Sequence, residues 1–254
     1  MNLADIASLR EQMTCICLSA TADTPIVLAK DSNAEPGFFP VASGFSPNSK
    51  PPLRTMMMGN NFGDEKYYDD FLNGRLRDIE GKTWKNLERL LWRVDRPQLT
   101  VQNCFFTNAY MDLMPSGKGM TGTTPGAKNQ RFIDASRRFL GVQLVKLQPW
   151  AIVCLGKQAR DLLARCSPDL LLRWRNRTLI SLDQSGLQIV ENLTIDGMQS
   201  DVIIALLLHP SRRNGKNLSR RRYVDQAGHQ YENDAAEVEI LRRVATFIAR
   251  KTRS

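Results

Sequence analysis

The stretch that decides the fold is Asp201–Asn214, which reads D-V-I-I-A-L-L-L-H-P-S-R-R-N. The apolar run from Val202 to Leu208 is too short to span a membrane and too uniformly apolar for a strand with one exposed face. We therefore expect a strand buried on both faces, as in a parallel sheet covered by helices. Pro210 cannot donate the next ladder hydrogen bond and biases the residue before it toward an extended conformation. The strand should thus end at His209, with its imidazole at the carboxyl edge of the sheet, where open α/β folds bind ligands.

Apolar runs of similar length recur along the chain and alternate with segments of helical periodicity. The runs expected to form strands are Thr55–Gly59, Val101–Tyr110, Trp150–Leu155 and, at an edge because it is more polar, Leu187–Leu193. The segments expected to form helices are Thr83–Val94, Asn129–Leu147, Lys157–Cys166 and Asp234–Lys251. Strands that alternate with helices predict an α/β sandwich with a mainly parallel sheet.

The chain before Thr55 has a different character. An amphipathic helix is expected to about Met13, and the Pro-, Gly- and Ser-rich stretch from Pro36 to Pro52 should be irregular and lie over the surface. With 254 residues and 42% hydrophobic content, the chain can bury a sizeable core. We expect a single domain over residues 1–254, with the segment to about residue 52 packed on its core.

The charge of the chain indicates its class of partner. A formal net charge of +9 should attract polyanions such as nucleic acid or an anionic membrane, although a solvated basic surface has the same composition. No apolar run approaches the roughly 18 residues of a membrane span. The first residues, M-N-L-A-D-I-A-S-L-R-E-Q-M, do not resemble a signal peptide. We expect a cytoplasmic protein without a membrane partner.

The five cysteines do not indicate a disulfide scaffold or a metal site. Cys104 and Cys154 lie inside apolar runs, as small core residues do. Cys15 and Cys17 form C-x-C with Cys166 far downstream, and the paired C-x-x-C spacing of zinc sites is absent. We therefore expect no metal.

Polar residues and glycines follow the expected strands at the points where each strand ends. They are Asn61, Asn108, Gly156 and His209. Because the carboxyl ends of parallel strands meet at one edge of a sheet, these residues are candidates for a common site. A single histidine is more often structural than catalytic, so its neighbours decide between the two roles.

Short motifs at these strand ends resemble those of the uracil-DNA glycosylase superfamily. They follow the family's order between Thr55 and Asn214 and read Gly59-Asn60-Asn61-Phe62-Gly63, Thr107-Asn108-Ala109, Leu155-Gly156-Lys157 with Ala159, and His209-Pro210-Ser211. Extended to H-P-S-x-R-N, the last motif is most similar to the single-strand-selective branch, and the mismatch-specific branch is also close. The resemblance implies a three-layer sandwich around a central four-stranded, mainly parallel sheet, no cofactor, and hydrolysis of the bond between a flipped base and deoxyribose.

The resemblance also implies a role for each matched residue. His209 would donate a hydrogen bond to the pyrimidine O2 and stabilise the departing anion. Asn61 would orient the attacking water, since an amide is not a strong base at neutral pH. The Asn108 amide would read the base, pairing with N3 and O4 of uracil or, after a flip, with N3 and N4 of cytosine. Gly59 and Gly63 would let the backbone approach the ligand closely.

A basic run follows the His-Pro-Ser motif. It contains six cations within eleven residues and no acid: Arg212, Arg213, Lys216, Arg220, Arg221 and Arg222. Such a run is usually only solvated, but its position directly after the proposed base pocket favours contact with phosphates. Arg212 or Arg213 would enter the space left by the flipped base. Ser211 and Lys157 are further candidates for contact with DNA.

The sequence departs from the family pattern at three places. Phe62 and Arg212 stand where the family has prolines, and Gly63 stands where the uracil-specific branch has an aromatic that excludes substituents at pyrimidine C5. Gly63 and the glycine-rich loop Pro115–Gly126 therefore suggest room for a larger base. An aromatic face for that base would come from Phe62, Tyr67, Tyr68 or Phe71, although core packing explains each of these residues equally well.

These features lead to one hypothesis and three alternatives. The hypothesis is a monomeric, monofunctional DNA glycosylase that removes C5-modified cytosine, hydroxymethylated or glucosylated as in phage DNA, leaving an abasic site as a form of antiviral defence. Uracil excision in base-excision repair is the alternative within the same enzyme class. A catalytically silent DNA-binding module, favoured by Phe62, and a metabolite-binding α/β protein belong to other classes.

Overall fold

The fold is built on a five-stranded sheet of order β2-β1-β3-β5-β4. The computed structural model describes residues 3–22, 24–29, 54–73, 75, 82–116, 122–193, 195, 197–198 and 201–253. The strands are β1 (Thr55–Gly59), β2 (Cys104–Asn108), β3 (Ala151–Leu155), β4 (Ile189–Leu193) and β5 (Val202–Leu207). Four of them are parallel, and β4 runs antiparallel to β5. The expected α/β class and mainly parallel sheet are confirmed.

The sheet has one strand more than the four that the family resemblance implies. The additional strand is β4, in the stretch Leu187–Leu193 that the sequence predicts as an edge strand. Its residues Val190 and Leu193 are buried in one apolar layer, Ile189 is half-buried against the other, and Asn192 is exposed, so the strand is less buried than its parallel neighbours. A strand of this kind suits an antiparallel position at the sheet edge, outside the fully buried parallel strands.

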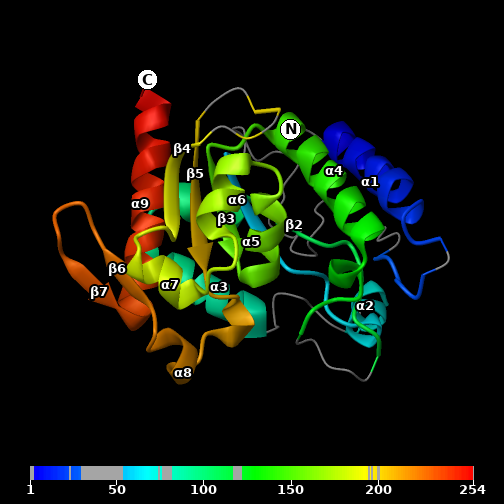
Figure 1. Cartoon of the computed structure of the whole chain (residues 1–254), viewed down its shortest axis with the longest axis horizontal. Helices are drawn as coiled ribbons and strands as arrows, with labels where there is room; N and C mark the ends of the chain where they lie inside the picture. The colour runs from blue at the N-terminus through cyan, green and yellow to red at the C-terminus, as the bar shows by residue number, and fades with distance from the viewer. Residues whose placement is uncertain are drawn as a thin grey trace.

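The parallel strands alternate their side chains between two apolar layers. In β1, Met56 and Met58 face a layer that includes α1 (Leu3–Leu18), α4 (Gln130–Leu147), α5 (Lys157–Ala164) and α6 (Pro168–Trp174). Met57 faces a layer that includes α3 (Lys82–Val94) and α9 (Asn233–Arg253). Figure 1 shows these helices around the sheet, with α9 at one side and α1 and α4 at the other. Helices therefore cover both faces, and every residue of the four parallel strands is buried.

The helices of the described part of the chain are α1 (Leu3–Leu18), α2 (Glu65–Leu72), α3 (Lys82–Val94), α4 (Gln130–Leu147), α5 (Lys157–Ala164), α6 (Pro168–Trp174), α7 (Leu179–Gln184), α8 (Gly215–Leu218) and α9 (Asn233–Arg253). Of these, α1, α3, α4, α5 and α9 fall on the segments predicted as helical, whereas α2, α6, α7 and α8 were not predicted. A hairpin of β6 (Arg222–Val224) and β7 (Gln230–Glu232) leads into α9. Within this part of the chain, no helix has the length and apolarity needed to cross a membrane.

Several boundaries differ from the predicted ones. The strand expected from Val101 begins only at Cys104, because residues 101–103 form a 3-10 turn. Helix α1 continues past Met13 to Leu18 and packs on α4. The irregular stretch Pro36–Pro52 lies outside the described residues.

Candidate active site at the carboxyl edge of the sheet

The register of the parallel strands brings four strand ends together at one edge. Gly59 at the end of β1 is paired with Asn108 at the end of β2, and Leu155 at the end of β3 is paired with Leu207 at the end of β5. The segments that continue from these strands carry the polar residues singled out in the sequence. Their convergence is a direct consequence of parallel pairing.

A cleft of about 1370 Å³ opens at this edge. The predicted residues that line it are Gly59, Asn61, Phe62, Gly63, Lys157, His209, Ser211 and Arg212. The predicted residues that do not line it are Asn108, Arg213, Lys216 and Arg220. Ligand pockets usually measure about 300–1000 Å³, so this cleft has space for more than a bare pyrimidine.

Gly156 is the point at which three strand ends converge. Its φ is +103°, and an added Cβ would lie 3.1 Å from His209 Cβ and 3.4 Å from Asn60 Oδ1. Asn60 Oδ1 also accepts a hydrogen bond from the N–H of Ala159 in α5 at 3.4 Å. Asn60, to which the sequence analysis assigned no role, therefore lies beside the histidine. The signal was present in the sequence as a pair of adjacent asparagines after the strand.

Asn61, the predicted water-orienting residue, lies in the same cleft as His209. Its Nδ2 donates to the carbonyl of Gly63 at 3.3 Å, which fixes the orientation of the amide. Gly63 has a φ of +99°, a conformation that disfavours any side chain. The backbone alone thus accounts for glycine at position 63, independently of any base substituent.

His209 is held in one tautomer by its own turn. The N–H of Ser211 donates to His209 Nδ1 at 3.4 Å, and Ser211 Oγ lies 2.8 Å from the same nitrogen. Since Nδ1 accepts a backbone hydrogen bond, the proton of the neutral ring is on Nε2. Burial, and then the charge of Arg212, lower the pKa of His209 to about 4. At neutral pH the imidazole is therefore an uncharged Nε2–H donor.

The side-chain amide of Asn108 is buried and makes no hydrogen bond among the described residues. The residue is 1% exposed, and neither Oδ1 nor Nδ2 has a hydrogen-bond partner among the described residues. Buried amides are almost always paired, and an unpaired one is a candidate for a ligand contact. Asn108 nevertheless does not line the cleft itself.

Three aromatic side chains line the cleft, namely Phe62, Tyr67 and Trp84. Phe62 is half-buried and meets Tyr68 edge-on, with ring centroids 5.9 Å apart. Tyr67 lines the cleft, and so does Trp84 of α3, whose helical spacing predicted only core packing. Trp84 also packs edge-on against Phe106 at 5.0 Å. The side chain of Phe71 lies outside the described part of the structure.

The basic run divides into exposed and internally paired cations. Arg212, Lys216 and Arg220 are exposed, as is Lys157. Arg213 instead pairs with Asp234 and Glu237 of α9, and its side chain is 6% exposed. The remaining two members are also paired, Arg221 with Asp183 and Glu237, and Arg222 with Glu232. The guanidinium of Arg213 is thus committed to an internal pair rather than presented to a ligand.

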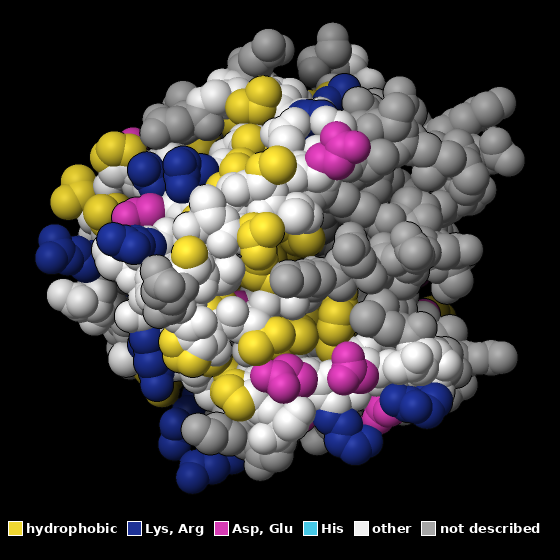
Figure 2. Space-filling model, turned by 90° about the vertical axis from the view of Figure 1, so that its right-hand side faces the viewer, with side chains coloured by type: hydrophobic (Ala, Val, Ile, Leu, Met, Phe, Trp, Pro, Cys, Tyr) yellow, Lys and Arg dark blue, Asp and Glu magenta, His cyan; other side chains and the backbone are white. Residues whose placement is uncertain are grey.

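A second group of cations borders the cleft. Arg165, Arg175 and Arg177 are exposed and line it from α5 and from the connection between α6 and α7. Their sequence signal, R-W-R-N-R at residues 173–177, was not used in the sequence analysis. Figure 2 views the molecule from the right-hand side of Figure 1 and shows Lys and Arg gathered along the left and lower left margins of that view.

The loop after β2 also reaches the cleft. Gly122 and Thr123 line it, and Gln158 Nε2 of α5 donates to the carbonyl of Gly122 at 2.6 Å. At the base of this loop, the carboxylate of Asp112 accepts a hydrogen bond from the N–H of Gly126 at 2.6 Å. Burial raises the pKa of Asp112 to about 6, although this hydrogen bond acts in the opposite direction.

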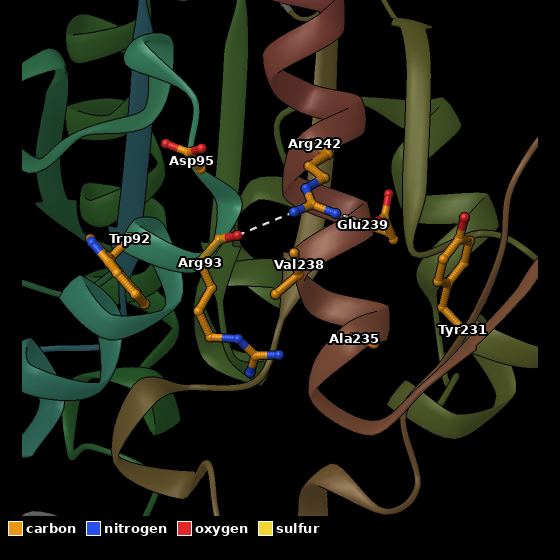
Figure 3. A pocket seen from close by; sticks show the side chains of 8 residues that line it. All are labelled: Trp92, Arg93, Asp95, Tyr231, Ala235, Val238, Glu239 and Arg242. Carbon is orange, nitrogen blue, oxygen red and sulfur yellow. Dashed lines mark hydrogen bonds and ion pairs between the residues drawn. The ribbon is translucent and has the colours of Figure 1, made fainter.

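A separate depression of about 560 Å³ lies between α3, β7 and α9 (Figure 3). Arg242 Nη2 donates across it to the carbonyl of Arg93 at 3.3 Å, and Arg242 pairs with Glu239. It contains none of the predicted site residues. Among the residues that the structure describes, no group of His, Cys, Asp or Glu side chains could hold a metal ion.

Comparison with known protein families and with curated proteins gives no match for this chain.

Proposed function

We propose that the protein is a DNA glycosylase that accepts a base flipped out of DNA into the cleft and hydrolyses its N-glycosidic bond. The observation that carries the proposal is the state of His209, whose Nδ1 is occupied by the Ser211 turn so that Nε2–H is free to donate. The same cleft contains Asn61, whose amide is suited to orient water.

Stabilisation of the negative charge on the departing base is the first requirement of this chemistry. As the bond from C1′ to the base nitrogen breaks, both electrons leave with the base and the sugar becomes oxocarbenium-like. An uncharged Nε2–H at the pyrimidine O2 stabilises the anion, and a single donor of this kind contributes roughly 3 kcal/mol. Water then bonds to C1′, and the proton that it loses neutralises the base.

Orientation of the attacking water is the second requirement. Asn61 Nδ2 is engaged with the Gly63 carbonyl, which leaves the amide oxygen to accept a hydrogen bond from water. The amide cannot remove a proton at neutral pH, so its contribution is orientation. The oxocarbenium-like sugar is reactive enough for an oriented, neutral water.

Recognition of the base is assigned to Asn108 and to aromatic side chains that line the cleft. The buried amide of Asn108 has no hydrogen-bond partner among the described residues and provides one donor and one acceptor for a pyrimidine edge. Asn108 does not line the cleft, but it is paired in register with Gly59, which does, so we propose that the base reaches it past Gly59. Phe62 and Tyr67 provide apolar surface in the cleft. For the backbone we propose contacts from Lys157, Ser211, Arg212, Lys216 and Arg220, and we leave out Arg213 because it is paired internally.

For the substrate we propose a C5-modified cytosine, hydroxymethylated or glucosylated, in antiviral defence. The volume of the cleft and the approach of the loop at Gly122 favour a base larger than uracil. Uracil excision in repair is the second candidate, because Asn108 can pair with either ring. Gly63 no longer discriminates between them, since its backbone conformation explains it.

The test is incubation of the purified protein with oligonucleotides that each contain one uracil, cytosine, 5-methylcytosine, 5-hydroxymethylcytosine or glucosylated hydroxymethylcytosine. Abasic sites are detected by alkaline cleavage and the released base by mass spectrometry. Product from the modified cytosines supports the proposal, and product only from uracil selects repair. DNA binding without product on any substrate selects the silent DNA-binding module.

Two substitutions test the catalytic roles proposed for Asn61 and His209. Asn61→Ala and His209→Ala should each lose at least about 100-fold in turnover, as removal of one oriented group does. Both should keep most of their DNA affinity, because neither residue is proposed to contact phosphate. An unchanged rate in either variant refutes the role assigned to that residue.

A further inference from the structure

A single buried carboxylate holds the segment that carries His209. Glu237 of α9 has 0% exposed surface. Its Oε1 accepts a hydrogen bond at 2.7 Å from the N–H of Leu208, the residue directly before the histidine. Its Oε2 pairs with the guanidinium of Arg213, four residues after the histidine. The two oxygens of one side chain thus fasten both ends of the segment.

A second guanidinium reinforces this attachment. Arg221, directly before β6, is 1% exposed, and its Nε lies 3.3 Å from Glu237 Oε1. Its Nη2 donates to the carbonyl of Leu206 at 3.0 Å, and its Nη1 lies 3.3 Å from Asp183 Oδ1 of α7. The cluster therefore binds the backbone on both sides of the last residue of β5.

The segment is also attached to α3. Asn86 Nδ2 donates to the carbonyl of Pro210 at 2.9 Å. The turn that fixes His209 Nδ1 is thereby bound from α9 and from α3. These contacts leave the ring little freedom to change its direction.

The composition of the cluster argues for a positioning role. Buried ion pairs are often no more stabilising than packed apolar side chains of the same volume, because their charges must be removed from water. What a hydrogen-bonded buried pair provides, and an apolar cluster does not, is a fixed direction for the backbone groups that it binds. Here these groups are the carbonyl of Leu206 and the N–H of Leu208, on either side of the strand end.

We infer that Glu237 is a positioning residue for His209, fixing the segment Leu208–Arg213 so that the imidazole Nε2 meets the leaving base. This inference rests on the proposed glycosylase function. Glu237 does not line the cleft, so it acts through the histidine rather than on the substrate. No motif in the sequence indicates it, because a glutamate on a helix is almost always exposed to solvent.

The variant that tests the inference is Glu237→Asp, which keeps the charge but shortens the side chain by one methylene. The shortened carboxylate cannot reach the N–H of Leu208 while it pairs with both arginines. Single-turnover base release should fall by about 100-fold, the effect of misplacing a catalytic group by about 1 Å. The DNA dissociation constant should change by less than about twofold, because the exposed cations are untouched.

Glu239→Asp is the matched control. It makes the same substitution on the same helix, two residues away, where the side chain pairs with Arg242 beside the separate depression. Its rate of base release should equal that of the unmodified protein. Equal losses in the two variants would overturn the inference, because they would reflect a general effect on α9.

A second readout separates positioning from stability. The chain has only two histidines, so His229→Gln assigns the imidazole ¹⁵N signals of His209. The unmodified protein should show a neutral ring protonated on Nε2, and folded Glu237→Asp should show mixed tautomers and a titration closer to pH 6.5. A lower melting temperature with unchanged ring signals and an unchanged rate would overturn the inference.

The unmodified protein provides a test that needs no variant. The backbone amide hydrogen of Leu208 should exchange with solvent as slowly as those of the buried strand β5, because this N–H donates a hydrogen bond to Glu237. Exchange as fast as that of an exposed amide would overturn the inference. A protein that releases no base from any DNA would refute the proposed function, whereas the ring signals and Leu208 exchange would still decide the role of Glu237.

Discussion

Gly156 and His209 approach each other so closely that a Cβ on Gly156 would lie 3.1 Å from the Cβ of His209. The contact joins the end of β3 to the end of β5, and the Asn60 side chain from the end of β1 lies at the same point. Three strand ends therefore meet where an added Cβ would press on the histidine more closely than in ordinary van der Waals contact. Any enlargement of this position should displace the histidine.

Gly156→Ala should lower both stability and activity. The backbone at φ +103° is strained for alanine, and the added methyl group presses on His209. The free energy of unfolding, measured by urea denaturation, should fall by about 1–3 kcal/mol. Base release should fall further than the folded fraction explains.

Gly141→Ala provides the control for this prediction. Gly141 lies inside α4, where an added Cβ meets nothing within 4 Å. Alanine there should stabilise the helix by about 0.5–1 kcal/mol and leave base release unchanged. Destabilisation by both substitutions would show that the effect at Gly156 is not specific to the strand ends.

The rate of base release should not depend on His209 ionisation near neutrality. Its pKa of about 4 in the folded protein lies below the ordinary 6.5, because burial and Arg212 disfavour the charged ring. The histidine contribution to stability is thus complete above pH 6.5 and is lost as the pH falls through 4. A pH–rate profile should be flat from about pH 6 to 8. A half-maximal rate near pH 6.5 would contradict a half-buried ring that is neutral at that pH.

Adjacent arginines should give opposite phenotypes. Arg212→Ala should weaken DNA binding and lower the slope of log affinity against log salt by about 1, without loss of stability, because the side chain is exposed. Arg213→Ala should destabilise the fold by about 3–5 kcal/mol, since it removes the cation that pairs with Oε2 of the fully buried Glu237. Fluorescence anisotropy and thermal unfolding distinguish these results. A large change in the salt slope for Arg213→Ala below its unfolding temperature would place Arg213 on DNA.

Asp112→Asn should change how stability depends on pH. The folded-state pKa of about 6 lies above the ordinary value of 3.8, so the folded protein binds the proton more tightly and loses stability as the pH rises from about 4 to 6. Asparagine still accepts the Gly126 N–H and carries no charge to desolvate. The variant should therefore be more stable than the unmodified protein at pH 7 but not at pH 4. If the melting temperatures of the two proteins changed equally between pH 4 and pH 7, this prediction would be wrong.

The sequence predicts the central sheet well because local pattern and tertiary environment agree there. Val202–Leu208 and Trp150–Leu155 are uniformly apolar, and the structure buries the corresponding strands completely. The short helices α6 and α7 were missed because they are too short to show a clear helical periodicity. Their first turns are stabilised by capping side chains, Ser167 and Thr178, which accept backbone hydrogen bonds. The hairpin β6–β7 was missed because its strands are short and polar.

The candidate site is only partly predictable for a related reason. Strand ends follow from the apolar pattern, so the sequence predicts that Asn61 and His209 lie at one edge of the sheet, and both line one cleft. Which cations are exposed depends on partners distant in the chain, and nothing near Arg213 indicates that α9 supplies Asp234 and Glu237. Asn60 was passed over because only the packing at Gly156 brings its amide beside the histidine.

The irregular pairing of β4 at the sheet edge has a consequence for contacts between molecules of this protein. Asn192 has a φ of +54°, and the pairing with β5 shifts between Val190 and Leu193. A strand interrupted in this way presents an irregular row of amide and carbonyl groups, which a strand from a neighbouring molecule cannot extend. Glu191, tied to Arg243 at 2.5 Å, adds charge along the same row. This border of the sheet should therefore resist the edge-to-edge stacking that begins aggregation.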